Sequence, residues 1–156
     1  MNINEVSDLF NSLITATDKK SEIRVYKGFI GILNDLENKN LTEKQIQLIE
    51  EELDALKLKA NPENRKKYFS QKLTEFKKYL KDKFSFISEG YYTGIGLSLG
   101  ISFGVTFGVV YGKVPYGMIL GMLLGLTIGA VMDSKAKKEG RVLNTKLKQK
   151  TGYSTV

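Results

Sequence analysis

The strongest constraint on this chain is a stretch of 43 residues, 90–132, that carries a single charge, Lys113. Lys113 divides it into two uncharged segments, 90–112 and 114–132. As helices these would extend about 35 Å and about 28 Å, against a hydrocarbon core of roughly 30 Å. Pro115, two residues after the lysine, interrupts a helix. The stretch therefore predicts a hairpin of two transmembrane helices.

A soluble protein could also bury such a hairpin inside a shell of other helices. Tyrosines mark both ends of the two predicted spans, as in the aromatic belt of a membrane protein: Tyr91, Tyr92, Tyr111 and Tyr116. The roughly 85 residues before the hairpin are also too few to enclose it and to form a core of their own. Both observations favour insertion in a bilayer.

Basic residues bracket the uncharged stretch. The net charge is −3 over residues 1–60, +4 over 61–89 and +5 over 133–156, within a total of +7. Such flanks suit a hairpin that faces anionic headgroups, and the positive-inside bias predicts that both termini are cytoplasmic, at the cytoplasmic (inner) membrane. The basic residues expected to face lipid are Lys77, Lys78, Lys81, Lys83, Lys135, Lys137, Lys138 and Arg141.

Glycine recurs at every fourth position through both predicted spans. Because glycine is about 1 kcal/mol less favourable than alanine in a helix, two such rows need a physical reason. In lipid, helices associate through close backbone contact, which small residues permit. We expect the rows to join either the two helices of one chain or, as a homo-oligomer, several copies. The rows are Gly96, Gly100, Gly104, Gly108 and Gly112 in the first span, and Gly117, Gly121, Gly125 and Gly129 in the second.

A second row in the first span consists of Ser98, Ser102 and Thr106. Their hydroxyls can bond to the carbonyl four residues earlier, or they can line a polar pathway. The spans contain no Asp, Glu, Arg or His, which argues against a proton relay or an ion-coupled transporter.

The first 60 residues predict three helices, over residues 3–17, over 21–37 and from Thr42, where Thr42 and Gln45 have capping-box spacing. A fourth helix is predicted over 62–87, with Asn61 as its N-cap and Pro62 at its first position. Its apolar stripe either packs against the first three helices or lies in the membrane interface. The stripe consists of Phe69, Leu73, Phe76, Leu80, Phe84 and Ile87.

Composition excludes several kinds of site. The chain has no cysteine and no histidine, which removes disulfides, thiolate sites and the commonest general base and metal ligand. The acidic run at residues 50–54 fits the solvated face of a helix, and the basic run at 135–150 lies too close to the membrane to favour nucleic acid. We expect no catalytic residue, no metal and no cofactor, and the N-terminus has no secretory signal pattern.

Residues 96–129 resemble the glycine-zipper membrane proteins, which are defined by repeated GxxxG spacing in apolar helices. The whole chain also resembles an uncharacterised bacterial family in which such a hairpin follows a Lys-rich helix and precedes a segment like Met132-Asp133-Ser134-Lys135-Ala136-Lys137-Lys138-Glu139-Gly140-Arg141. The resemblance implies helix packing in a membrane. Channel subunits, toxins, anchors and stress proteins all carry the pattern.

The sequence thus predicts an all-α protein in four parts: N-terminal helices at 1–60, a basic amphipathic juxtamembrane helix at 61–89, the glycine-zipper hairpin at 90–133 and a basic cytoplasmic tail at 134–156. The function expected is a non-enzymatic membrane anchor or scaffold for the helical domain, with a protein partner. An oligomeric pore or membrane-perturbing effector is the alternative, and a non-catalytic subunit of a transport or enzyme complex is a third.

Overall fold

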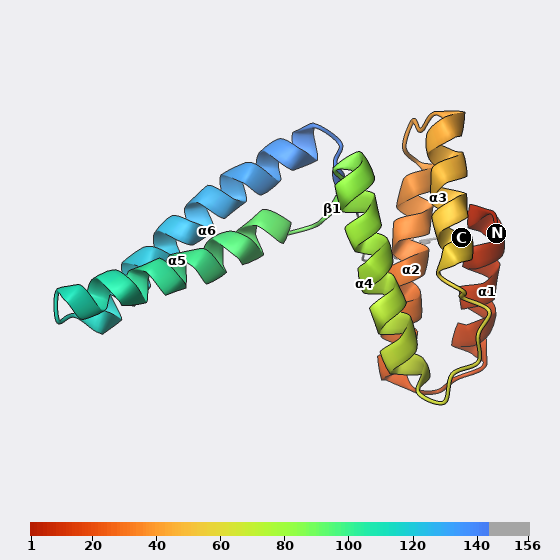
Figure 1. Cartoon of the computed structure of the whole chain (residues 1–156), viewed down its shortest axis with the longest axis horizontal. Coiled ribbons are helices and arrows are strands. Elements are labelled where there is room, and N and C mark those ends of the chain that lie inside the picture. Colours follow the sequence, from red (N-terminus) through yellow and green to blue (C-terminus); the bar gives the residue numbers. More distant parts are fainter. Residues whose placement is uncertain (144–156) are drawn as a thin grey trace, which may run out of the picture. The chain divides into compact units, whose positions relative to one another are not determined.

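The computed structural model describes residues 1–143, so most of the predicted tail lies outside the described residues. The fold is all-α, as predicted, apart from one pair of two-residue strands. The elements are α1 (Ile3–Thr15), α2 (Lys20–Glu37), α3 (Glu43–Ala55), α4 (Arg65–Phe84), β1 (Ile87–Ser88), α5 (Tyr91–Val110), α6 (Val114–Lys138) and β2 (Val142–Leu143) (Figure 1). The described residues form two compact units, Met1–Phe86 with Leu143, and Ile87–Val142.

Local side-chain caps set the starts of two of the first three helices. The Oδ1 atom of Asn2 accepts a hydrogen bond from the backbone N–H of Glu5 at 2.7 Å, which satisfies one free donor of α1. Thr42 and Gln45 form the predicted capping box of α3. The N–H of Gln45 donates to Thr42 Oγ1 at 3.3 Å, and the N–H of Thr42 donates to Gln45 Oε1 at 2.9 Å. This prediction is confirmed.

The predicted start of α4 was wrong by three residues. Asn64 is the N-cap, and its Oδ1 atom accepts from the N–H of Lys67 at 3.0 Å. Asn61 instead accepts from the guanidinium of Arg65 at 2.9 Å, and Pro62 lies in the preceding loop. Two asparagines compete for the same role, and the contact with Arg65 engages the first of them.

The predicted end of α4, at residue 87, was also too late. Ser85 adopts a left-handed conformation with φ 57°, and its N–H donates to the carbonyl of Lys81 at 2.9 Å. The helix therefore ends at Phe84, since a left-handed residue breaks the helical pattern of hydrogen bonds.

The apolar stripe of α4 packs against the first three helices. Phe69, Phe76 and Leu80 are buried, and Phe69 meets the ring of Phe10 edge-on, with 5.6 Å between centroids. At Gly28 of α2, an added methyl would lie 2.9 Å from the side chain of Leu73. α4 thus belongs to the same helical unit as α1, α2 and α3, which favours the core interpretation of its stripe over the interfacial one.

The second unit consists of the hairpin of α5 and α6 with β1 and the first residue of β2, Val142. α6 runs six residues past the predicted end of its span, to Lys138. Gly140 follows with φ 68°, and the N–H of Arg141 donates to the carbonyl of Ala136 at 3.0 Å, a glycine-dependent helix end. β1 pairs with β2, where the N–H of Ile87 donates to the carbonyl of Arg141 at 2.9 Å. Strands of two residues carry no periodic signal, so the sequence did not predict them.

Candidate functional site: the glycine-packed hairpin

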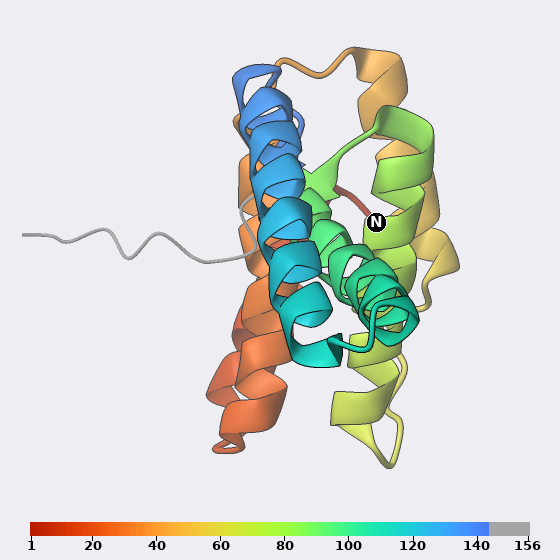
Figure 2. The same cartoon turned by 90° about the vertical axis from the view of Figure 1, so that its left-hand side faces the viewer.

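The two glycine rows face each other within one chain. α5 and α6 run antiparallel and side by side (Figure 1), and a short turn joins them (Figure 2). An added methyl at Gly104 would lie 3.1 Å from the Cα of Gly121, and one at Gly121 would lie 2.7 Å from the Cα of Gly104 and closer to the carbonyl oxygen of Gly100. These atoms belong to backbone, which has no rotamer to change. Glycine is therefore required at this seam by backbone approach.

The register of the seam follows from the nearest neighbours of each glycine. Gly96 meets Gly125, and Gly100 meets Gly121. Toward the turn, an added methyl at Gly108 would lie 2.7 Å from the Cα of Val114. At the base, one at Gly129 would lie 2.6 Å from the Cα of Thr93. The glycines that pack against the opposite helix or the turn are Gly96, Gly100, Gly104, Gly108, Gly117, Gly121, Gly125 and Gly129.

Gly112 does not belong to this row, which corrects the sequence interpretation. It lies in the turn with φ 67°, and an added Cβ would have no neighbour within 4 Å. The helix ends at Val110, and the N–H of Lys113 donates to the carbonyl of Gly108 at 2.7 Å. Gly112 continues the spacing of four by sequence, but its role is to supply a left-handed residue in the turn.

The serine and threonine row of α5 bonds to its own helix. Ser98 donates to the carbonyl of Gly94, Ser102 to that of Ser98 and Thr106 to that of Ser102, each at 2.9 Å. These bonds satisfy the hydroxyl donors without a polar partner. The geometry favours the local interpretation of this row over a polar pathway.

Asp133 of α6 caps the beginning of α5, a role that the sequence did not reveal. Its carboxylate accepts hydrogen bonds from the backbone N–H of Tyr92 at 3.0 Å, the N–H of Thr93 at 2.9 Å and the hydroxyl of Thr93 at 2.6 Å. The residue at the N-cap itself, Gly90, has no side chain to provide an acceptor. The free N–H groups and positive end of the helix dipole favour an anion here. Asp133 therefore closes the open end of the hairpin.

The basic residues of α4 predicted to face lipid lie in the first unit. Lys78, Lys81 and Lys83 are exposed, whereas Lys77 is partly buried. Burial lowers the pKa of the Lys77 ammonium, because desolvation disfavours the charged form. Lys77 is thus a less suitable headgroup contact than its exposed neighbours.

The basic residues after the second span lie at the end of α6. Lys135, Lys137 and Lys138 are exposed in its last turn, where cations interact favourably with the helix dipole. Arg141 donates from Nε to the carboxylate of Glu139 at 2.7 Å, and this hydrogen bond raises the pKa of its guanidinium. The predicted headgroup contact of Arg141 therefore competes with an internal ion pair.

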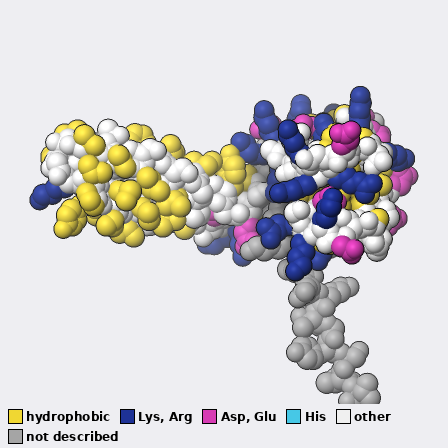
Figure 3. Space-filling view, turned by 90° about the horizontal axis from the view of Figure 1, so that it is seen from below, with side chains coloured by type: hydrophobic (Ala, Val, Ile, Leu, Met, Phe, Trp, Pro, Cys, Tyr) yellow, Lys and Arg dark blue, Asp and Glu magenta, His cyan; other side chains and the backbone are white. Residues whose placement is uncertain are grey.

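On the face of the hairpin that Figure 3 shows, hydrophobic side chains gather along both helices, and the basic side chain lies at the tip. The most apolar 18-residue windows of α5 and α6 have mean hydropathies of 1.7 and 1.8, and only 11% of each window is buried. A core helix of a soluble protein would be mostly buried. Leaving this many large apolar side chains in water would be unfavourable at roughly 25 cal/mol per Å², so a bilayer is the environment that suits this surface.

Comparison with known proteins also relates the hairpin to membrane proteins. Residues 88–135 match the family described as Glycine zipper membrane protein. The hairpin of this chain is therefore similar to glycine-zipper membrane proteins, and its two long apolar helices support association with a membrane. No curated protein and no solved structure matches the chain. Within residues 1–143, no cluster of three or more His, Cys, Asp or Glu side chains could hold a metal ion.

Proposed function

We propose that the protein is a non-enzymatic membrane anchor or scaffold, in which the glycine-zipper hairpin holds the helical unit of α1–α4 at the bilayer for a protein partner. The observation that carries this proposal is the use of the glycine rows inside one chain. Because Gly100 and Gly121 already meet each other, the hairpin needs no second copy to satisfy its packing. The helical unit also has its own aromatic core, centred on Phe10, Phe29 and Phe69.

The oligomeric pore has less support from the same geometry. A pore built on glycine contacts between copies would need a free glycine row, and eight of the nine zipper glycines lie against α5, α6 or the turn. A hydrophilic lumen would benefit from hydrogen-bond donors directed to water, and the hydroxyl hydrogens of Ser98, Ser102 and Thr106 are donated within α5.

A leakage assay separates the anchor from the pore. The full chain is reconstituted into phosphatidylcholine and phosphatidylglycerol vesicles that contain a self-quenching dye, and flotation verifies its incorporation. We expect dye retention equal to that of protein-free vesicles over a range of protein-to-lipid ratios. Leakage that rises with the amount of incorporated protein would contradict the anchor and support the pore.

We further propose that the hairpin crosses the inner membrane twice, with both termini in the cytoplasm. The chain has no cysteine, so each introduced cysteine gives an unambiguous signal. In intact cells or spheroplasts, an impermeant thiol reagent should label Tyr116→Cys, beside the turn. It should label Lys59→Cys, in the helical unit, only after the membrane is permeabilised. Labelling in the reverse order would show the opposite topology.

A further inference from the structure

One side of the seam between α5 and α6 is an open apolar groove of about 620 Å³. The glycine rows form its floor, and large side chains four residues apart form its two walls. Those of α5 are Leu99, Phe103 and Phe107, and those of α6 are Leu120, Leu124 and Ile128. These six side chains are between 53% and 65% exposed. Residues that follow the glycines directly, such as Leu97 and Ile101, are only partly exposed. The groove is therefore the unfilled side of the seam.

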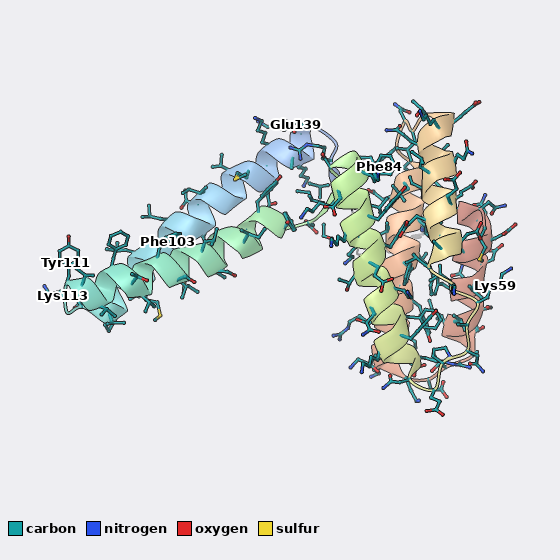
Figure 4. All side chains as sticks on the ribbon, viewed as in Figure 1. Lys59, Phe84, Phe103, Tyr111, Lys113 and Glu139 are labelled. Atoms are coloured by element: carbon teal, nitrogen blue, oxygen red, sulfur yellow. The ribbon has the colours of Figure 1, made fainter. Side chains whose placement is uncertain are left out.

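The groove is apolar along its length and cationic at one end. Lys113 lines it at the turn, together with Tyr111 and Tyr116, whose side chains are 76% and 69% exposed. Figure 4 shows Tyr111 and Lys113 at the tip of the hairpin, with Phe103 nearer its middle. Among the described residues that line the groove there is no acidic side chain. An ammonium and two phenols at the mouth can together bind a phosphate.

We propose that this groove binds one anionic phospholipid, with an acyl chain along the glycine floor and the phosphate at Lys113. The dimensions fit. From Gly96 to Gly108 the floor rises about 18 Å along α5, at roughly 1.5 Å per residue. One leaflet is about half of a hydrocarbon core of roughly 30 Å. An acyl chain of the leaflet on the side of the turn thus has the length of the floor.

Charge selects lipid over a second copy of the chain as the occupant. Consider two copies with the same topology that are related by a two-fold axis along the membrane normal and meet groove to groove. The Lys113 side chains of the two copies would then lie beside each other. Like charges at an interface are unfavourable, whereas an anionic headgroup neutralises the ammonium. The proposal requires only that the hairpin lies in a bilayer. It does not depend on whether the helical unit binds a protein partner.

The chain contains no tryptophan, so a single introduced tryptophan reports on lipid at a chosen place. Phe103→Trp places it on the wall of the groove. Ile119→Trp is the matched control: Ile119 is 52% exposed, does not line the groove, and lies at a similar depth because Gly104 meets Gly117 and Gly100 meets Gly121. The full chain is reconstituted in phosphatidylcholine, and quenching is measured while phosphatidylglycerol or phosphatidylcholine with brominated acyl chains is added.

At Phe103→Trp we expect brominated phosphatidylglycerol to associate about fivefold more strongly than brominated phosphatidylcholine, the effect of one cation near a headgroup. At Ile119→Trp the two lipids should quench equally. Adding Lys113→Gln to Phe103→Trp should abolish the preference while leaving quenching itself intact.

Three results would overturn the proposal. The first is that the tryptophans at 103 and 119 show the same preference for phosphatidylglycerol over phosphatidylcholine. The second is that this preference at 103 persists in the presence of Lys113→Gln. The third is a tryptophan at 103 that neither lipid quenches while both quench the one at 119, which would show a second copy over the groove. If neither position is quenched, the hairpin does not lie in the bilayer, and the proposed anchor fails as well. If the vesicles leak in the dye assay while the preference for phosphatidylglycerol at 103 is observed, only the proposed anchor function is contradicted, and the lipid site stands.

Discussion

Gly100→Ala is expected to separate α5 from α6 and to lower the free energy of unfolding of the hairpin by about 3 kcal/mol, the upper part of the usual range for overpacking. The added methyl would meet the carbonyl oxygen of Gly121 and would lie 3.1 Å from the Cα of Gly125. Both neighbours are backbone atoms, so only a movement of a whole helix relieves the contact. Helix propensity acts in the opposite direction, because alanine is about 1 kcal/mol the better helix former.

The matched control is Gly94→Ala, in the same helix. A Cβ at Gly94 would have no neighbour within 4 Å, so the propensity gain should act alone and stability should stay level or rise slightly. The measurement is an SDS titration of each variant in mixed micelles, with chemical crosslinking of the same samples. Gly100→Ala should destabilise the monomer without removing crosslinked species. Equal stability of the two variants would contradict packing through the glycine rows, and the loss of a discrete crosslinked ladder from an intact monomer would assign them to an oligomer.

The second large effect is expected at Asp133. Asp133→Ala removes three hydrogen bonds to a carboxylate, from Tyr92 N–H, Thr93 N–H and the Thr93 hydroxyl. Two of these donors are backbone groups at the start of α5 that have no partner within that helix. We expect a loss of about 2–3 kcal/mol in the free energy of unfolding, the range for a bond to a charged acceptor and for a helix cap. The same SDS titration measures it.

Three variants make this test specific. Ser134→Ala changes the neighbouring exposed residue and should have no measurable effect. Asp133→Asn keeps an oxygen acceptor without the charge and should show about half of the loss. In a double-mutant cycle, Asp133→Ala and Thr93→Val should be less than additive, because the two side chains share one bond. Strict additivity would show that Asp133 acts through some route other than this cap.

Features with a local cause could be predicted from the sequence. Thr42 and Gln45 lie three residues apart and bond to each other, so their capping box is already present in the spacing. The stripe of α4 is likewise a property of helical periodicity, and Phe69 and Phe76 are buried. The prediction failed where two local candidates competed, as with Asn61 and Asn64 at the start of α4.

Features that join distant parts of the chain could not be predicted in the same way. Asp133 and Thr93 are 40 residues apart, and no repeat or motif links them. One signal in the sequence could have pointed to this contact. Asp133 is an isolated carboxylate at the end of an apolar span, and the N-cap of the other span, Gly90, has no side chain. Gly112 shows the converse error, since it continues the spacing of four in the sequence although the helix has already ended.

The sequence by itself determined that this chain has two apolar helices that suit a membrane, that a short turn joins them as a hairpin, and that one glycine face of each helix is available for close contact. Those properties depend on hydropathy and on a glycine period of four residues, both of which can be read from each helix separately. Only the tertiary structure decided that Gly100 meets Gly121 in the same chain, that Asp133 closes the base, and that one side of the seam stays open as a groove ending at Lys113. Each of these depends on the register and orientation of two helices, which a periodic pattern leaves free because every fourth residue looks the same.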